Sequence, residues 1–132
     1  MTQEERDLLI KDLCTRLPYG IKVEYENEIF DVEHVCPMYE EVKLDIPETW
    51  TIDVSEVKPY LFPMSSMTEE QKEELDKYLD MDSKSLIDGY KNGLKCAHPY
   101  FNVQDWYNKN HFDYRGLIPM GMAIDATGKN IY

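Results

Sequence analysis

The sequence predicts an α+β fold: an N-terminal helix, then a small curled or barrel-like antiparallel sheet of four to five strands, then two to three helices. Apolar residues recur at helical spacing at the start of the chain and again after about residue 68, and between these regions they alternate with polar residues. The length of 132 residues is that of one domain. We therefore expect residues 1–132 to form a single domain, with a helix over 3–16, a sheet over about 20–62, a helical region over about 68–118 and a C-terminal tail over 119–132.

The first helix has a start signal, an apolar stripe and a stop signal. Thr2 and Glu5 have the spacing of a capping box, in which each side chain bonds the backbone N–H of the other residue. Pro18 and Gly20 end the helical pattern. The apolar stripe between them consists of Leu9, Ile10, Leu13 and Leu17.

Four segments then alternate between apolar and polar residues, as half-buried strands do. They cover Ile21–Tyr25, Phe30–His34, Val42–Ile46 and Trp50–Val54. The second of them places His34 on the apolar face. Residues 57–62 form a possible fifth strand, which Pro59 and Pro63 confine to a sheet edge.

Helical spacing returns at Thr68, which opens a second capping box with Gln71. A further segment starts near Ser83, and a third helix starts after Asn102 and runs to about Asn110. Residues 120–124 are apolar enough to pack back onto the body.

The chain is acidic, and the acidity is concentrated in its first half. The net charge is -12 overall and -9 over residues 1–60, whereas residues 96–132 are neutral. Such a field repels phosphate backbones and anionic lipid headgroups, so we expect no direct nucleic-acid binding and no membrane binding. A basic protein partner is electrostatically favoured, although net charge of this kind also simply confers solubility.

The compartment follows from the cysteines and from the apolar runs. Cys14, Cys36 and Cys96 are an odd number of cysteines without a C-x-x-C pair, and the chain starts without a charged-then-apolar leader. No apolar run approaches the roughly 18 residues that a membrane span requires. We therefore expect a cytoplasmic location.

Metal, cofactor and catalytic motifs are missing at the sequence level. The three histidines and three cysteines show no metal-ligand spacing, although Cys96 and His98 are close enough to chelate. Cys36 and His34 would lie about 7 Å apart on one strand, beyond hydrogen-bond reach. No glycine-rich phosphate motif is present. We expect no metal, no cofactor and no catalytic residue.

The densest chemistry lies in residues 105–118. Its candidate residues are Trp106, Tyr107, His111, Asp113, Tyr114 and Arg115. One interpretation is a structural clasp, in which Asp113 accepts from a backbone N–H or pairs with Arg115, while Gly116 ends the preceding helix at a positive φ. The other is a docking surface, because Trp, Tyr and Arg are enriched in binding hot spots.

Three stretches carry a resemblance to a known family. They are Leu17-Pro18-Tyr19-Gly20, the run from Val57 to Glu70, and His111-Phe112-Asp113-Tyr114-Arg115-Gly116-Leu117-Ile118. Together they resemble a family of small uncharacterised proteins from phages and mobile elements of gut Bacteroidales. The family has no assigned activity, so the resemblance implies a genomic setting and no catalytic residue.

These observations rank three hypotheses about function. The first is a noncatalytic accessory or protein-interaction protein of a phage or mobile element. The second is an acidic DNA-mimic inhibitor of a nucleic-acid-binding protein, suggested by the charge of residues 1–60. The third and weakest is a small hydrolase, which requires a pocket with His34 or His98 beside an acid.

Overall fold

The protein is an α+β structure, as the sequence predicts, and its N-terminal helix has the predicted bounds. The computed structural model describes residues 1–47, 51–77 and 103–132. Helix α1 spans Gln3–Arg16, and the Thr2 hydroxyl accepts a hydrogen bond of 3.1 Å from the Glu5 N–H. Leu9, Ile10 and Leu13 form its buried side. The short 3-10 helix η1 (Leu17–Tyr19) follows, and Gly20, with φ at 82°, leads into the sheet.

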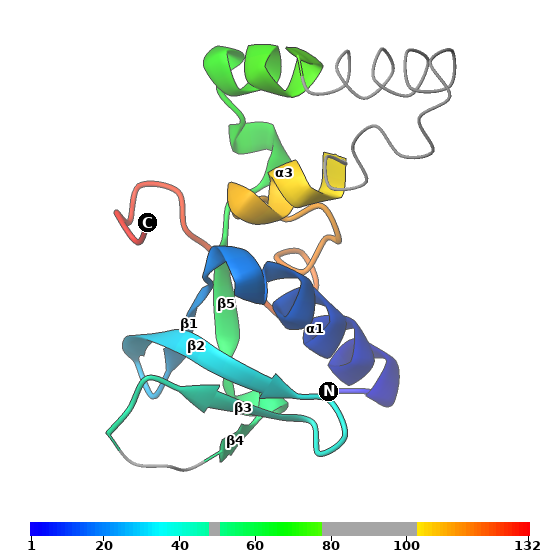
Figure 1. Cartoon of the computed structure of the whole chain (residues 1–132), viewed down its shortest axis with the longest axis vertical. Helices are drawn as coiled ribbons and strands as arrows, with labels where there is room; N and C mark the ends of the chain where they lie inside the picture. The colour runs from blue at the N-terminus through cyan, green and yellow to red at the C-terminus, as the bar shows by residue number, and fades with distance from the viewer. Residues whose placement is uncertain (48–50, 78–102) are drawn as a thin grey trace, which may run out of the picture.

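The sheet is open and mixed and has six strands. These are β1 (Lys22–Tyr25), β2 (Glu28–Cys36), β3 (Glu41–Leu44), β4 (Thr51–Asp53), β5 (Lys58–Leu61) and β6 (Ile124–Asp125), in the order β4-β3-β2-β1-β5-β6. The first four strands form the predicted antiparallel meander, and a 3-10 helix, η2 (Val54–Glu56), connects β4 to β5 (Figure 1). The predicted curled or barrel-like antiparallel sheet of four to five strands is therefore corrected: the described residues form six strands, one pair of strands is parallel, and the sheet is not closed.

Strand β5 was predicted at an edge, and this prediction is wrong. It pairs antiparallel with β1 through Pro59, opposite Val23, and parallel with β6 from Tyr60 onward. Pairing with β6 begins only after Pro59, so the missing N–H of this proline removes no bond from that ladder. The sixth strand was not predicted, because residues 124–125 are too short to show an alternating pattern.

A β-bulge in β2 overturns the predicted orientation of His34. Val32 pairs with Leu44 and His34 with Lys43, so β2 carries one extra residue at this point. Because strand side chains alternate with a period of two, the extra residue exchanges the faces beyond it. Val35 consequently packs against the core, whereas His34 is exposed.

The core lies between α1 and the sheet. Its buried side chains come from α1, from the inner face of the sheet and from the C-terminal segment, and include Leu9, Leu13, Val23, Val42, Leu61, Leu117 and Met122. Arg6 on α1 pairs with Glu40 at 3.0 Å and with Asp53 at 2.6 Å, which fixes the start of the helix to the turn before β3 and to the end of β4.

The helical region after the sheet is described in part. Residues 69–77 are helical, and the predicted capping box is present: the Gln71 N–H donates to the Thr68 hydroxyl at 3.2 Å, and the Thr68 N–H donates to the Gln71 side chain at 2.9 Å. Helix α3 spans Val103–Lys109 and lies on the side of α1 away from β2, β3 and β4 (Figure 1). The expected segment near Ser83, with Cys96 and His98, lies outside the described residues.

Candidate functional site

Two places in the structure concentrate polar chemistry: the predicted C-terminal segment and a pocket at one end of the sheet. In the first, a single carboxylate binds two arginines. Arg115 Nη1 donates to Asp12 Oδ1 at 2.8 Å, and Arg16 Nε donates to Asp12 Oδ2 at 2.8 Å. Asp12 and Arg16 are fully buried. The Tyr114 ring lies beneath both guanidinium groups, 4.5 Å from Arg115 and 5.4 Å from Arg16, measured from Cζ to the ring centroid.

The next residues fold into a tight turn that Asp113 holds. Its two carboxylate oxygens accept from the backbone N–H groups of Leu117 at 2.8 Å and Ile118 at 2.9 Å. Of the two partners considered for Asp113, it therefore takes the backbone, and Arg115 pairs with Asp12 instead. Gly116 has φ at 75° within this turn.

Helix α3 ends at Lys109 and His111 closes its C-terminus, so the expectation that Gly116 ends this helix is corrected. The Phe112 N–H bonds the Tyr107 carbonyl at 2.9 Å, and the His111 N–H bonds the Asn108 carbonyl at 3.2 Å. This is the Schellman pattern, in which the residue after the helix takes a positive φ. His111 occupies that position with φ at 62°, where glycine is the usual residue.

The aromatic side chains of the segment pack on one another and on the end of β5. Trp106 and Phe112 stack at 5.6 Å between ring centroids, and both are almost fully buried. Residue Phe62, directly after β5, exchanges backbone bonds of 2.8 Å with His111 and Asp113. All six candidate residues of this segment are buried or half-buried. This placement favours the structural clasp over the docking surface.

His111 also contacts the C-terminal tail. Its ring stacks on Tyr132 at 3.5 Å between centroids, and burial, together with the positive charges of Arg16 and Lys22, lowers the pKa of His111 to about 4. The Tyr132 hydroxyl donates to the Tyr60 carbonyl at 2.8 Å and accepts from the Lys22 N–H at 3.0 Å. Lys22 and Tyr60 are the positions at which the β1–β5 ladder would continue, so the phenol bridges the two strands where direct pairing stops.

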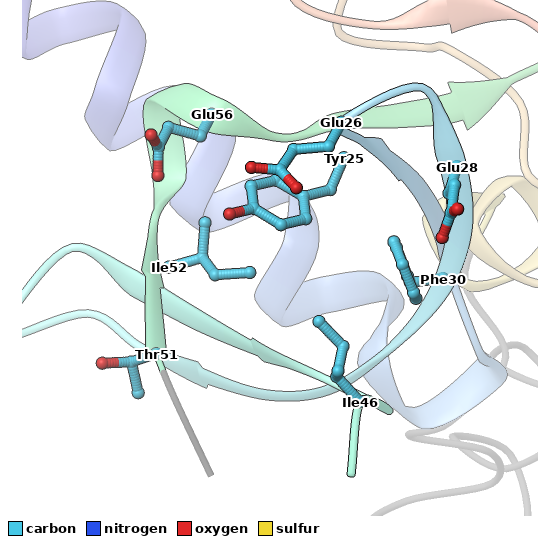
Figure 2. Close-up of a pocket in the computed structure, with 8 residues that line it drawn as sticks. All are labelled: Tyr25, Glu26, Glu28, Phe30, Ile46, Thr51, Ile52 and Glu56. Atoms are coloured by element: carbon cyan, nitrogen blue, oxygen red, sulfur yellow. The ribbon is translucent and has the colours of Figure 1, made fainter. Parts of the chain in front are cut away.

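The second place is a pocket of about 390 Å³. Its lining comes from β1, the β1–β2 turn, β2, the segment after β3, β4 and η2. It consists of Tyr25, Glu26, Glu28, Phe30, Ile46, Thr51, Ile52 and Glu56 (Figure 2). Tyr25 and Phe30 continue the inner apolar face of β1 and β2 beyond Val23 and Val32. Because the sheet is open at this end, their rings stay half-buried and form a wall of the pocket.

The pocket combines an apolar interior with an acidic edge. The rings of Tyr25 and Phe30 lie 6.3 Å apart, tilted by 55°, while Glu26, Glu28 and Glu56 are exposed at the edge (Figure 2). None of these three glutamates forms an ion pair within the described part of the chain. Partial burial, the charge of Glu26, a hydrogen bond to that carboxylate and the charge of Glu56 raise the pKa of Tyr25.

The two-residue β1–β2 turn places Glu26 at this edge. Glu26 and Asn27 both have positive φ, 49° and 64°, and connect the paired residues Tyr25 and Glu28. A positive φ is uncommon for glutamate, so the hairpin holds the backbone of Glu26 in a conformation that other residue types adopt more readily. The pocket was not predicted from the sequence, because its residues come from separate segments. The aromatic residues that flank the turn were the available signal.

The described residues form neither a metal site nor a membrane-spanning helix. No group of three or more His, Cys, Asp or Glu side chains is arranged to hold a metal ion in the described ranges. No helix there is both long enough and apolar enough to cross a membrane. Cys14 and Cys36 are half-buried free thiols. No protein-family model, curated protein or solved structure matches the chain.

Proposed function

We propose that this protein is a noncatalytic protein-interaction module that docks a basic segment of a protein partner at the acidic end of its sheet. The resemblance of the segments around Leu17, Val57 and Asp113 supports a role as an accessory protein of a phage or mobile element, acting in the bacterial cytoplasm. The observation that carries the proposal is the pocket edged by Glu26, Glu28 and Glu56.

The distribution of ion pairs supports this location. Five acids of the first 60 residues already have cationic partners, namely Asp12, Asp31, Glu33, Glu40 and Asp53. The pocket glutamates have none in the described ranges, and they surround apolar surface that a partner would remove from water. Charge complementarity raises the association rate, and apolar burial lowers the dissociation rate. A basic segment with one apolar or amphipathic anchor fits both requirements.

Affinity capture from host lysate with quantitative mass spectrometry tests the proposal. The bait variant Glu26→Gln/Glu28→Gln/Glu56→Gln removes three charges without changing side-chain length. A matched control, Glu70→Gln/Glu73→Gln/Asp76→Asn, removes three exposed charges from the helical residues 69–77. We expect basic proteins to be enriched by the wild type and by the control but not by the pocket variant. Equal enrichment by all three baits would refute docking at the pocket.

The DNA-mimic alternative has less support. It requires rows of free carboxylates on the sheet face, yet Asp31 pairs with Lys22 at 2.9 Å and Glu33 pairs with Lys43 at 3.0 Å. The hydrolase alternative required a pocket with His34 or His98 beside an acid. His34 instead lies exposed on β2, outside the pocket lining.

A further inference from the structure

We infer that the pocket accepts one arginine side chain of the partner, with its guanidinium stacked on Tyr25 and Phe30 and bonded to the carboxylates at the edge. The inference rests on the proposed function and specifies the chemistry that this site recognises. Three observations carry it: the ring geometry, the charge of the edge, and an arrangement of the same groups elsewhere in the chain.

The rings form a wall that suits a flat cation. Tyr25 and Phe30 are 6.3 Å apart and tilted by 55°, and Ile46 and Ile52 complete the apolar interior (Figure 2). A guanidinium group is planar and weakly hydrated, so it stacks on an aromatic face at little desolvation cost. The aliphatic stem of arginine contacts the apolar lining while its guanidinium lies over the rings, within reach of the carboxylates at the edge.

The edge supplies the acceptors. Glu26, Glu28 and Glu56 carry three negative charges, with no cation paired to them in the described part of the chain. An entering cation relieves their mutual repulsion. A guanidinium fork bonds a carboxylate through two parallel N–H groups, whereas an ammonium group acts as a point charge. This difference favours arginine over lysine.

The chain already uses this combination inside its own fold. Arg115 stacks on Tyr114 at 4.5 Å and donates to Asp12 at 2.8 Å. A tyrosine face and a carboxylate thus bind one guanidinium there. The pocket presents the same two groups, in Tyr25 and the neighbouring glutamates, without an internal arginine among the described residues.

Two other cationic ligands fit the geometry less well. A methylated ammonium group is bound by several aromatic rings that surround it, and the lining contains two. A divalent metal ion requires converging carboxylates, and no such group of three exists among the described residues. Binding of either ligand in place of arginine is an outcome of the test.

The test is an NMR titration of the 15N-labelled wild-type protein with three uncharged-backbone peptides, acetyl-Gly-Xaa-Gly-amide, where Xaa is arginine, lysine or citrulline. Citrulline keeps the shape of arginine and removes its charge. We expect the arginine peptide to shift the amide signals of Glu26, Glu28 and Thr51. We also expect it to bind about fivefold to tenfold more tightly than the lysine peptide, with no saturable binding of the citrulline peptide. A trimethyllysine peptide and Ca²⁺ serve as the competing ligands.

The outcomes separate this inference from the proposed function. Equal or tighter binding of lysine, citrulline, trimethyllysine or Ca²⁺, or no shift at the pocket with any probe, overturns the arginine inference. Pocket-dependent capture of a basic partner would still support the docking function in that case. Loss of the arginine response in Tyr25→Leu, with retention in the Glu70→Gln/Glu73→Gln/Asp76→Asn control, locates binding on the ring. Retention in Tyr25→Leu also overturns the inference.

Discussion

Removal of the Asp12 side chain is expected to destabilise the fold more than removal of the Arg115 side chain, and far more than removal of an exposed acid on the same helix. Asp12 is fully buried and accepts bonds of 2.8 Å from both Arg16 and Arg115. Asp12→Ala leaves the fully buried Arg16 guanidinium without its counter-ion, and breaking a buried pair in this way costs about 3–5 kcal/mol. In Arg115→Ala, Asp12 keeps Arg16, so the main loss is one charged hydrogen bond, about 1.5–3 kcal/mol. The weaker bond of 3.3 Å to the Thr15 hydroxyl and the stacking on Tyr114 are lost with it.

Thermal and urea unfolding followed by circular dichroism measure these changes. In a domain of this size each kcal/mol shifts Tm by about 3–5 °C, so Asp12→Ala lowers Tm by about 9–25 °C. The matched control is Asp7→Ala, an exposed acid on the same helix, for which we expect a change below about 0.5 kcal/mol. A double-mutant cycle between Asp12 and Arg115 isolates their coupling. If Asp12→Ala costs no more than Asp7→Ala, the buried cluster does not hold the C-terminal segment on α1.

Three further predictions concern the C-terminal region. Tyr132→Phe removes the hydroxyl between Lys22 and Tyr60 and should cost about 1–3 kcal/mol in urea unfolding; an unchanged midpoint would mean that this bridge contributes nothing. The folded state holds the pKa of His111 near 4, below its usual 6.5, so the unfolded state binds the proton first and stability falls as pH drops from about 6.5 to 4. His111→Asn should reduce the dependence of the unfolding free energy on pH between about 4 and 6.5. An identical dependence in the variant and the wild type would contradict the lowered pKa of His111. Gly116→Ala, at φ 75° in open space, should cost about 1 kcal/mol through backbone strain alone, and a cost near zero in the same unfolding assay would argue against strain.

Local signals predicted the parts of the fold that depend on neighbours in sequence. The caps at Thr2 and Thr68 act over three residues: the Thr68 box has both of its bonds, and at Thr2 the hydroxyl accepts from the Glu5 N–H. The antiparallel meander was predictable because apolar and polar residues alternate along each strand and the strands are joined by short turns. Strand β6 could not be predicted, because two residues show no period and their pairing with β5 depends on packing.

The orientation of His34 shows that one extra residue in a strand can reverse a predicted side-chain orientation even where the strand itself is correctly predicted. Its strand exists, but the bulge between Val32 and His34 reverses the faces, and alternation alone cannot locate a bulge. Arg115 shows a different limit. Its preference for a carboxylate follows from its chemistry, yet Asp12 lies 103 positions away in sequence, and only the fold brings the two together.

The acidity of the first half of the chain is organised by these contacts. Four of its six basic residues, Arg6, Arg16, Lys22 and Lys43, pair with acids of the same half. The Arg6 pairs fix α1 to the sheet, those of Lys22 and Lys43 link neighbouring strands, and Arg16 pairs within α1, so all four cations are neutralised inside the fold. The glutamates at the open end of the sheet are left without counter-ions in the described residues, next to apolar rings that the open sheet leaves half-covered. A cationic, partly apolar ligand stabilises unpaired negative charge that lies beside exposed aromatic surface. Here this combination arises from which acids form ion pairs within the fold. The net charge alone does not indicate where the unpaired acids lie.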